Sequence, residues 1–193
     1  MSTVNDVALQ EVPRPHGRDE VVAAVIDAAT TLFAARGPAA VSLREIAQAA
    51  DVNLGLIYRH IGSKADLLIA VLKARPGMAP AAQDMLEEAT AMLGRGLAPP
   101  AYTVIVVRAA LDGYNLATLG VDYPTLEAWA RGLRARLTPV DADLRAGVAI
   151  AMLLGWHALG RTILDVLGRA DLTPEDVARS LEPALSAFLS AVA

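Results

Sequence analysis

Residues 42–64 read SLREIAQAADVNLGLIYRHIGSK, and this segment carries the clearest structural signal in the chain. Two short helices that cross at a sharp corner need three features: a small residue where they touch, a corner residue that tolerates left-handed backbone, and an inward apolar anchor. Ala47, Asp51 and Ile57 supply these features in that order. The segment therefore predicts a helix-turn-helix.

Capping residues mark where the helices of this segment begin. Ser42 and Glu45 form a capping box, with a hydroxyl at the N-cap and a carboxylate three residues later. Asn53 caps the second helix of the motif. Ser63 and Asp66 repeat the capping box and open a further helix. These signals place three helix starts within 22 residues of one another.

Polar side chains of the segment lie where a DNA backbone would require hydrogen-bond donors. Tyr58, His60 and Lys64 cluster around the junction between the motif's second helix and the next one. The helix N-termini at Ser42 and Ser63 add free backbone N–H groups, which favour phosphate. Phosphate contacts position a protein on DNA without reading its sequence. The segment thus predicts a phosphate-binding surface.

Base readout is expected from other residues. Arg44 can reach a guanine edge with two hydrogen bonds, and the second motif helix presents Asn53, Leu54, Gly55 and Leu56 to the groove. Arg59 either joins the DNA contacts or is simply solvated, and His60 either contacts phosphate or packs. The alternative is a three-helix unit with a solvated polar face. It is disfavoured because capping, corner and donors coincide.

Composition limits the class of protein. The 193 residues are 54% hydrophobic and 20% charged, which provides a core and argues against global disorder. The net charge is −4, but residues 14–75 hold 8 basic and 6 acidic side chains while the rest hold 9 and 15. Only the N-terminal part therefore suits an anionic partner. With no cysteine, no secretion signal at the N-terminus and a longest apolar run of 15 residues, we expect a soluble cytoplasmic protein without a membrane segment.

The pattern along the chain is helical throughout, with no convincing strand or repeat, and it predicts an all-α fold of about nine helices. We expect a flexible arm over residues 1–17, a DNA-binding domain over 18–77 and a C-terminal domain over 78–193. Proline and glycine separate the C-terminal helices, which we expect near residues 80–94, 101–118, 124–137, 141–168 and 174–191. Pro183 should bend or weaken the last of them.

The motif closely resembles the TetR/AcrR family of bacterial transcriptional regulators over about 50 residues. The resemblance is carried by residues such as Ala28, Phe33, Gly37, Ile57 and Tyr58, and it ends at Leu67. It implies an Ω-shaped all-α homodimer whose N-terminal domains bind a palindromic double-stranded operator and whose C-terminal domains dimerise and hold a small-molecule inducer. It also implies phosphate contacts for Tyr58, His60 and Lys64, a backbone contact for Ser42, and base reading for Arg44.

Three residues depart from the family pattern. Asp51 replaces the usual corner glycine and Ile61 replaces the usual phenylalanine, and both changes look structural. Leu54 is apolar where many members carry a polar or basic residue, which weakens the expectation of base reading there.

The C-terminal part predicts a dimer interface and a ligand pocket. The helix near 141–168 is apolar on nearly all sides, so we expect one side of it to pack within its own subunit. We expect another side, together with the helix near 174–191, to pack against a partner subunit. The alternative is a core helix of a monomer. Arg108 and Asp112 are spaced to pair on one helix. The candidate residues lining the pocket are Met85, Met92, Tyr102, Arg108, Asp112, Tyr114, Trp129, Met152, Trp156 and His157. For each of them, an ordinary packing or surface role is the alternative.

Other classes of protein fit less well. The three histidines are scattered, and no metal, phosphate-loop or nucleophile motif is present, so an all-α enzyme is the unfavoured alternative and we expect no metal or cofactor. A non-specific nucleoid protein would be strongly basic. We therefore expect a ligand-responsive repressor released by a small apolar inducer, with an activator or a ligand-independent regulator as alternatives.

Overall fold

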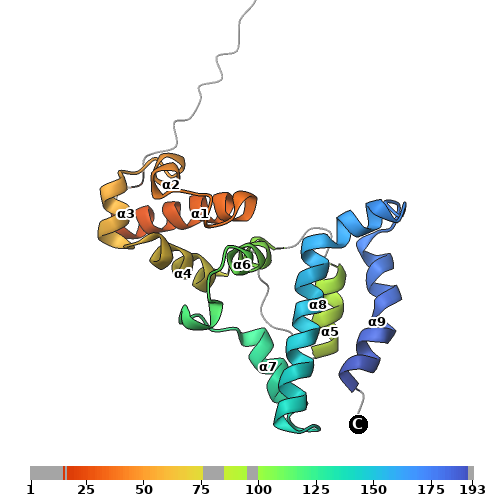
Figure 1. The fold of residues 1–193 in the computed structure, drawn as a ribbon. Helices are drawn as coiled ribbons and strands as arrows, with labels where there is room; N and C mark the ends of the chain where they lie inside the picture. The colour runs from red at the N-terminus through yellow and green to blue at the C-terminus, as the bar shows by residue number, and fades with distance from the viewer. Residues whose placement is uncertain (1–14, 16, 76–84, 95–99, 191–193) are drawn as a thin grey trace, which may run out of the picture.

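Helices make up all the regular structure in the part of the chain that the computed structural model describes, namely residues 15, 17–75, 85–94 and 100–190 (Figure 1). The all-α prediction is thereby confirmed. The elements are α1 Arg18–Arg36, α2 Leu43–Ala49, α3 Leu54–His60, α4 Lys64–Ala74, α5 Met85–Gly94, α6 Ala101–Leu111, a short 3₁₀ helix Leu116–Thr118, α7 Pro124–Leu133, α8 Pro139–Val166 and α9 Pro174–Ser190.

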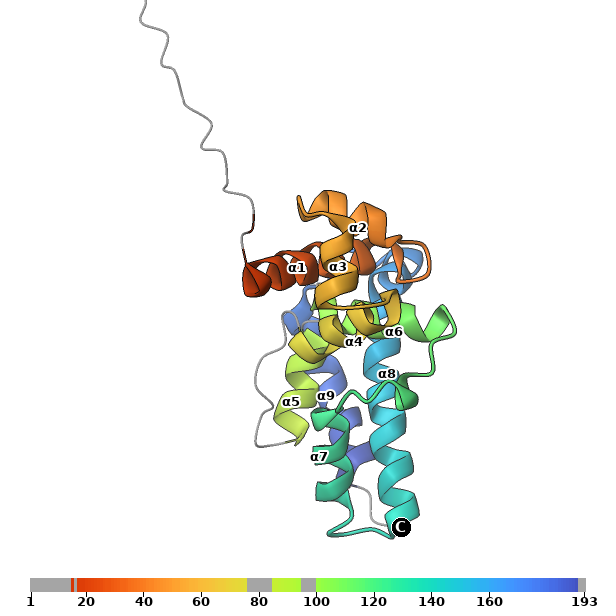
Figure 2. The same cartoon turned by 90° about the vertical axis from the view of Figure 1, so that its left-hand side faces the viewer.

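The first three helices pack around a shared apolar core, which α4 and α6 close from below in the view of Figure 1. Phe33 of α1, Ile46 of α2, Ile57 of α3 and Leu67 of α4 are all fully buried there. Burial of side chains of this size stabilises a fold by about 1.5–3 kcal/mol each. The core therefore fixes α2 and α3 against α1, and Figure 2 shows α3 on the outer side of this unit.

The corner between α2 and α3 forms as the sequence predicts. Asp51 has φ 50°, in the left-handed region, and the Val52 N–H donates to the Ala47 carbonyl at 3.0 Å. Both capping boxes are complete, with side-chain and backbone bonds in each direction at Ser42 and Ser63. These local signals determine the start and the crossing of the motif helices.

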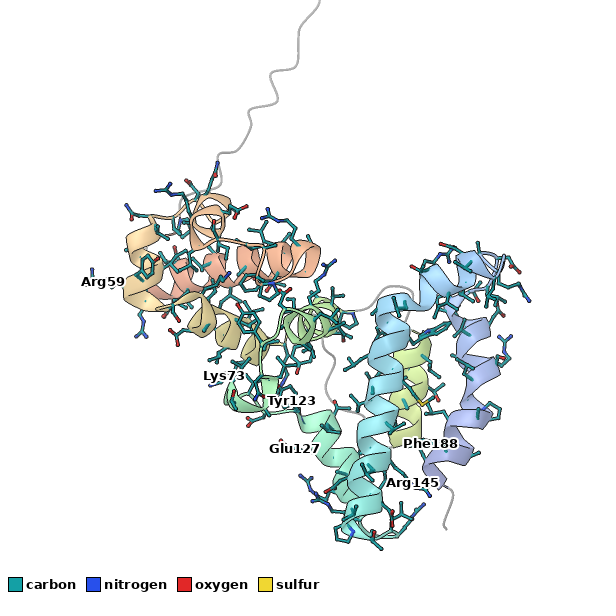
Figure 3. All side chains as sticks on the ribbon, viewed as in Figure 1. Arg59, Lys73, Tyr123, Glu127, Arg145 and Phe188 are labelled. Atoms are coloured by element: carbon teal, nitrogen blue, oxygen red, sulfur yellow. The ribbon has the colours of Figure 1, made fainter. Side chains whose placement is uncertain are left out.

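The remaining helices form a second lobe in which α8 is the central element. Helix α5 packs between α8 and α9, α7 packs along α8, and α6 joins this lobe to α1 (Figure 1). Arg145 of α8 donates from Nη1 to the Phe188 carbonyl of α9 at 3.0 Å (Figure 3). The inner face of α8 buries small side chains such as Ala142, Ala146 and Ala149, which let its neighbours approach closely.

Several predicted helix boundaries were wrong. The helix expected over 101–118 ends at Leu111, because Gly113 takes φ 86° and reverses the chain before the 3₁₀ turn. The helix expected over 124–137 ends at Leu133, and the next one starts at Pro139, where the Thr138 side chain caps it. Helix α9 continues through Pro183. The predicted arm, apart from residues 15 and 17, and the start of the helix expected near 80 lie outside the described residues.

Helix α8 has the length and composition of a membrane-spanning helix, the only one found in the described part of the chain. Length and composition alone are weak evidence, because a long core helix passes the same test. One face of α8 is buried against neighbouring helices through residues such as Leu153 and Leu164. The fold therefore accounts for the apolar inner face of α8 without a membrane.

Candidate nucleic-acid interface

The helix-turn-helix presents a group of polar side chains to solvent. Arg44 at the start of α2, and Tyr58 and Arg59 on α3, are exposed, and Figure 3 shows Arg59 on the outer side of α3. Tyr58 is 59% exposed, which is high for an aromatic residue. Ser42, Asn53 and Gly55 are exposed as well. The predicted DNA-contacting residues of α2 and α3 are thus gathered on one unit, with Arg44 and Arg59 as exposed cations.

Four of the residues predicted to contact DNA, among them Lys64, are only partly exposed. Leu54 and Leu56 pack against the N-terminal core, and His60 is half-buried. Asn53 uses its side-chain oxygen to accept from the Gly55 N–H at 2.7 Å, so its amide NH₂ group is what it can offer to a base. Readout from the start of α3 therefore rests on few polar groups.

Lys64 is engaged inside the DNA-binding unit. Its Nζ donates to the carbonyl oxygens of Pro38, Ala39 and Val41 at 2.9, 3.2 and 3.2 Å, so its ammonium holds the segment between α1 and α2. An ammonium has three donors. Direct contact with a phosphate, as the sequence predicts, would therefore require Lys64 to give up one of these bonds.

Replacing Lys64 with methionine is expected to destabilise the DNA-binding unit by about 1–3 kcal/mol, because three carbonyls lose a charged donor. Urea unfolding measures this change as a lower midpoint. Lys73→Met is the matched control, because Lys73 is an exposed lysine on the same helix (Figure 3). Equal midpoints for both variants would show that the three bonds do not hold the segment.

The same segment is held by two further residues, Arg36 and Asp112, in a role that the sequence did not predict. Arg36 donates from Nη2 to the Ala40 carbonyl at 2.8 Å and to Glu45 at 2.7 Å. Asp112, beyond the end of α6, accepts the Ala39 N–H at 2.7 Å. The predicted Arg108–Asp112 pair is wrong, because among the described residues Asp112 turns to this backbone instead. Residues 37–41 are therefore fixed from both lobes, immediately before Ser42 and Arg44.

Glu45 combines a cap with an ion pair. Hydrogen bonds from Ser42, first from its backbone and then from its hydroxyl, together with Arg36, lower the pKa of Glu45 from its usual 4.5 to about 2. The group is exposed and its pair with Arg36 is solvent-screened, so its contribution to overall stability is small and its main role is to fix the start of α2.

A pH series should reveal this carboxylate. Because its pKa is depressed on folding, Glu45 contributes stability that is fully present above pH 4.5 and is lost as pH falls towards about 2. The melting temperature of wild type should therefore exceed that of Glu45→Gln at pH 7, and the difference should shrink in that acid range. A difference independent of pH would contradict the assignment.

An apolar cavity opens where the two lobes meet. It is bounded by the end of α4, by α6, by the start of α7 and by α8, and its volume is about 100 Å³. Two of the predicted ligand residues, Met92 and Tyr102, line it. Sequence reasoning missed Arg75, Thr103, Val106, Tyr123, Pro124, Thr125, Leu126, Ile150 and Leu154, which line it too.

The other predicted ligand residues lie elsewhere. Arg108 and His157 border a separate hollow between α6 and α8, and His157 Nε2 lies 2.9 Å from the Met92 carbonyl oxygen. Met152 and Trp156 line a groove against α9. Trp129 is 2% exposed and belongs to the core of the C-terminal lobe. Tyr114 packs against the N-terminal core, and the side chain of Met85 lies outside the described residues. The predicted set is thus divided among several places.

The fold and the surface of α2 and α3 together define a helix-turn-helix DNA-binding protein. No group of three potential metal ligands occurs among the residues that the structure describes. Comparisons with known proteins assign the chain to a family within this class of DNA-binding proteins. Residues 25–71 match the family described as bacterial regulatory proteins, tetR family.

A curated relative spans almost the whole chain. The HTH-type transcriptional repressor Rv3405c of Mycobacterium tuberculosis is 37% identical over 185 residues, which cover 91% of this chain and 92% of the relative. The chain therefore belongs to the TetR family of transcriptional regulators and is not an enzyme. As a bacterial regulator of this family, it works in the cytoplasm.

Solved structures share the fold. BioQ of Mycobacterium smegmatis matches with a TM-score of 0.57 and 23% identity, covering 91% of this chain and 98% of BioQ. AibR in complex with isovaleryl coenzyme A and operator DNA matches with a TM-score of 0.56 and 17% identity, covering 86% of this chain and 97% of AibR. At these identities the likeness concerns the fold alone.

Proposed function

We propose that this chain is a repressor that binds a palindromic operator as an Ω-shaped homodimer and is released by a small apolar inducer. The observation that carries the proposal is the exposed set Arg44, Tyr58 and Arg59 on a helix-turn-helix whose preceding segment is fixed from both lobes. Repression is favoured by the curated relative, a repressor that shares 37% of the aligned residues. Bound to its operator, the protein resides on the nucleoid.

The outer face of α8 supports the homodimer. Val140, Leu144, Val148, Met152, Leu159 and Ile163 are 42–68% exposed and form one stripe along the helix. Contiguous exposed apolar surface of this kind marks an interaction site. A symmetric dimer would bury the stripe against its own copy. Gly155 lies in the same stripe with open space above its Cα, which leaves room for close approach.

The position of the cavity supports regulation by a ligand. Arg75 directly follows α4, whose other end carries the Lys64 that holds residues 37–41. Tyr102 and Val106 belong to α6, which packs against α1 and is followed directly by Asp112. A ligand in the cavity would therefore contact both helices that join it to the DNA-binding unit.

Gel shifts and transcription in vitro test the proposal. The protein is expected to retard DNA from upstream of its own gene and to lower transcription from the adjacent promoter. An increase in transcription would instead identify an activator. Failure to bind this DNA, with binding to unrelated fragments equally weak, would contradict the proposed role at that promoter.

A further inference from the structure

The cavity between the lobes contains one cation in apolar surroundings. Its lining is aliphatic and aromatic apart from Arg75 and a few hydroxyl groups, and no acidic residue is among the described residues that line it. Such a guanidinium is costly to desolvate unless an anion or several acceptors meet it. The partners of Arg75 therefore indicate what the cavity is built to receive.

Those partners satisfy Arg75 only in part. Nη2 donates to the Asp122 carbonyl oxygen at 3.1 Å, which directs the guanidinium towards the segment just before α7. Nε is buried, yet it has no acceptor among the described residues. None of the ion pairs found in the described part of the chain includes Arg75. The guanidinium thus has no acidic partner among the described residues and presents a buried donor without an acceptor at the cavity.

Tyr102 provides a second polar group beside it. Burial raises the pKa of Tyr102 above its usual 10.0, Tyr123 adds to this rise, and Arg75 opposes it by its charge and by a side-chain hydrogen bond. The phenol therefore stays protonated at neutral pH and can donate. The Tyr123 hydroxyl is engaged, because it donates to the Leu116 carbonyl at 2.9 Å. The polar end of the cavity thus consists of Arg75 and Tyr102.

We infer that the cavity binds a small apolar carboxylic acid, with its carboxylate on Arg75 and Tyr102 and its hydrocarbon body between α6 and α8. A guanidinium presents parallel N–H donors that match the two oxygens of a carboxylate. Val106, Ile150 and Leu154 offer an apolar wall for the body. The inference deepens the proposed function, on which it rests, by naming the chemical class of the inducer.

Calorimetric titration of the full chain tests the ligand class with matched probes. Octanoate and 3-phenylpropanoate carry a carboxylate, whereas 1-octanol and 3-phenylpropan-1-ol have the same bodies without the charge. At least one acid is expected to bind about tenfold or more tightly than its alcohol, because a charge-assisted hydrogen-bonded pair is worth that factor or more. Equal affinities, or no binding of either acid, would overturn the inference.

Three variants test the location. Arg75→Gln should remove the preference for the acid, and Lys73→Gln, which changes an exposed cation two residues away, should keep it. Leu154→Trp fills the cavity and should abolish binding of acid and alcohol alike. If Arg75→Gln keeps the preference for the acid, or if Leu154→Trp still binds the probes, the proposed binding site is wrong. If Arg75→Gln fails to fold, the probe pairs with wild type still test the ligand class and Leu154→Trp still tests the location.

A gel shift separates this inference from the proposed function. If the acids bind with the expected dependence on Arg75 but do not release DNA, the carboxylate site is supported and its role as the inducer site is contradicted. If an alcohol releases DNA as well as its acid does, the ligand-responsive repressor is supported and the inference of a carboxylate ligand is contradicted.

Discussion

Replacing Arg44 with alanine is expected to weaken binding to the specific operator by about 1–3 kcal/mol and to relax the preference at one base step. Arg44 is exposed at the start of α2 and has no ion pair or hydrogen bond with another described side chain, so its guanidinium is available to a guanine edge. Fluorescence anisotropy with the operator and with single-base variants measures both effects.

Arg59→Ala is the matched comparison for Arg44→Ala. Arg59 is exposed on α3. If it contacts a phosphate, its loss should weaken binding to all sequences alike and reduce the slope of log affinity against log salt concentration by about 1. Arg131→Ala, on the exposed side of α7, should leave binding unchanged. If Arg44→Ala lowers affinity equally for every sequence, the assignment of base reading to Arg44 is wrong.

Placing a charge on the α8 stripe is expected to have an even larger effect. Leu144 is 62% exposed in the single chain, and a symmetric dimer would bury two copies of Leu144→Glu without partners. The variant should sediment as a monomer and lose about 10²- to 10⁴-fold in operator affinity, because two linked half-site contacts become independent.

Leu111→Glu serves as the control for the α8 stripe. Leu111 is 82% exposed at the end of α6, outside the stripe, so its variant should remain a dimer. Sedimentation velocity distinguishes the two variants at the same concentration. A dimeric Leu144→Glu protein with unchanged operator affinity would place the interface elsewhere.

The helix-turn-helix could be predicted because its signals are local. Capping at Ser42 and Ser63 depends on residues three positions apart, and the corner at Asp51 depends on one backbone conformation. The end of α6 was missed although Gly113 carried a local signal for it. The apolar pattern beyond Gly113 resembled a continuing helix, but its residues belong to a 3₁₀ turn.

The long-range contacts could not be predicted in the same way. Lys64 meets carbonyls 23 to 26 residues away, and Asp112 meets a backbone N–H 73 residues away. Neither contact corresponds to a periodic pattern or a characteristic residue spacing that the sequence alone would show. Lys64 looked like a phosphate ligand because its position follows a capped helix start. Asp112 looked like the partner of Arg108 because it lies four positions further along the same predicted helix.

The cavity was predicted only in part for the same reason. Met92 and Tyr102 were identified as aromatic or sulfur-containing residues on apolar helices, a property that Trp129 and Trp156 share without lining the same space. No pattern in the sequence singles out Arg75. Only the tertiary fold brings the end of α4 next to α6, α7 and α8.

Selection of binding sites from random double-stranded DNA tests the DNA-binding role of residues 42–64 without assuming an operator. Two copies of the exposed surface on α2 and α3 in a symmetric dimer should select an inverted repeat, and Arg44→Ala should lose the preference at one symmetric pair of positions. Recovery of sequences with no shared motif, or of the same motif regardless of Arg44, would contradict the account.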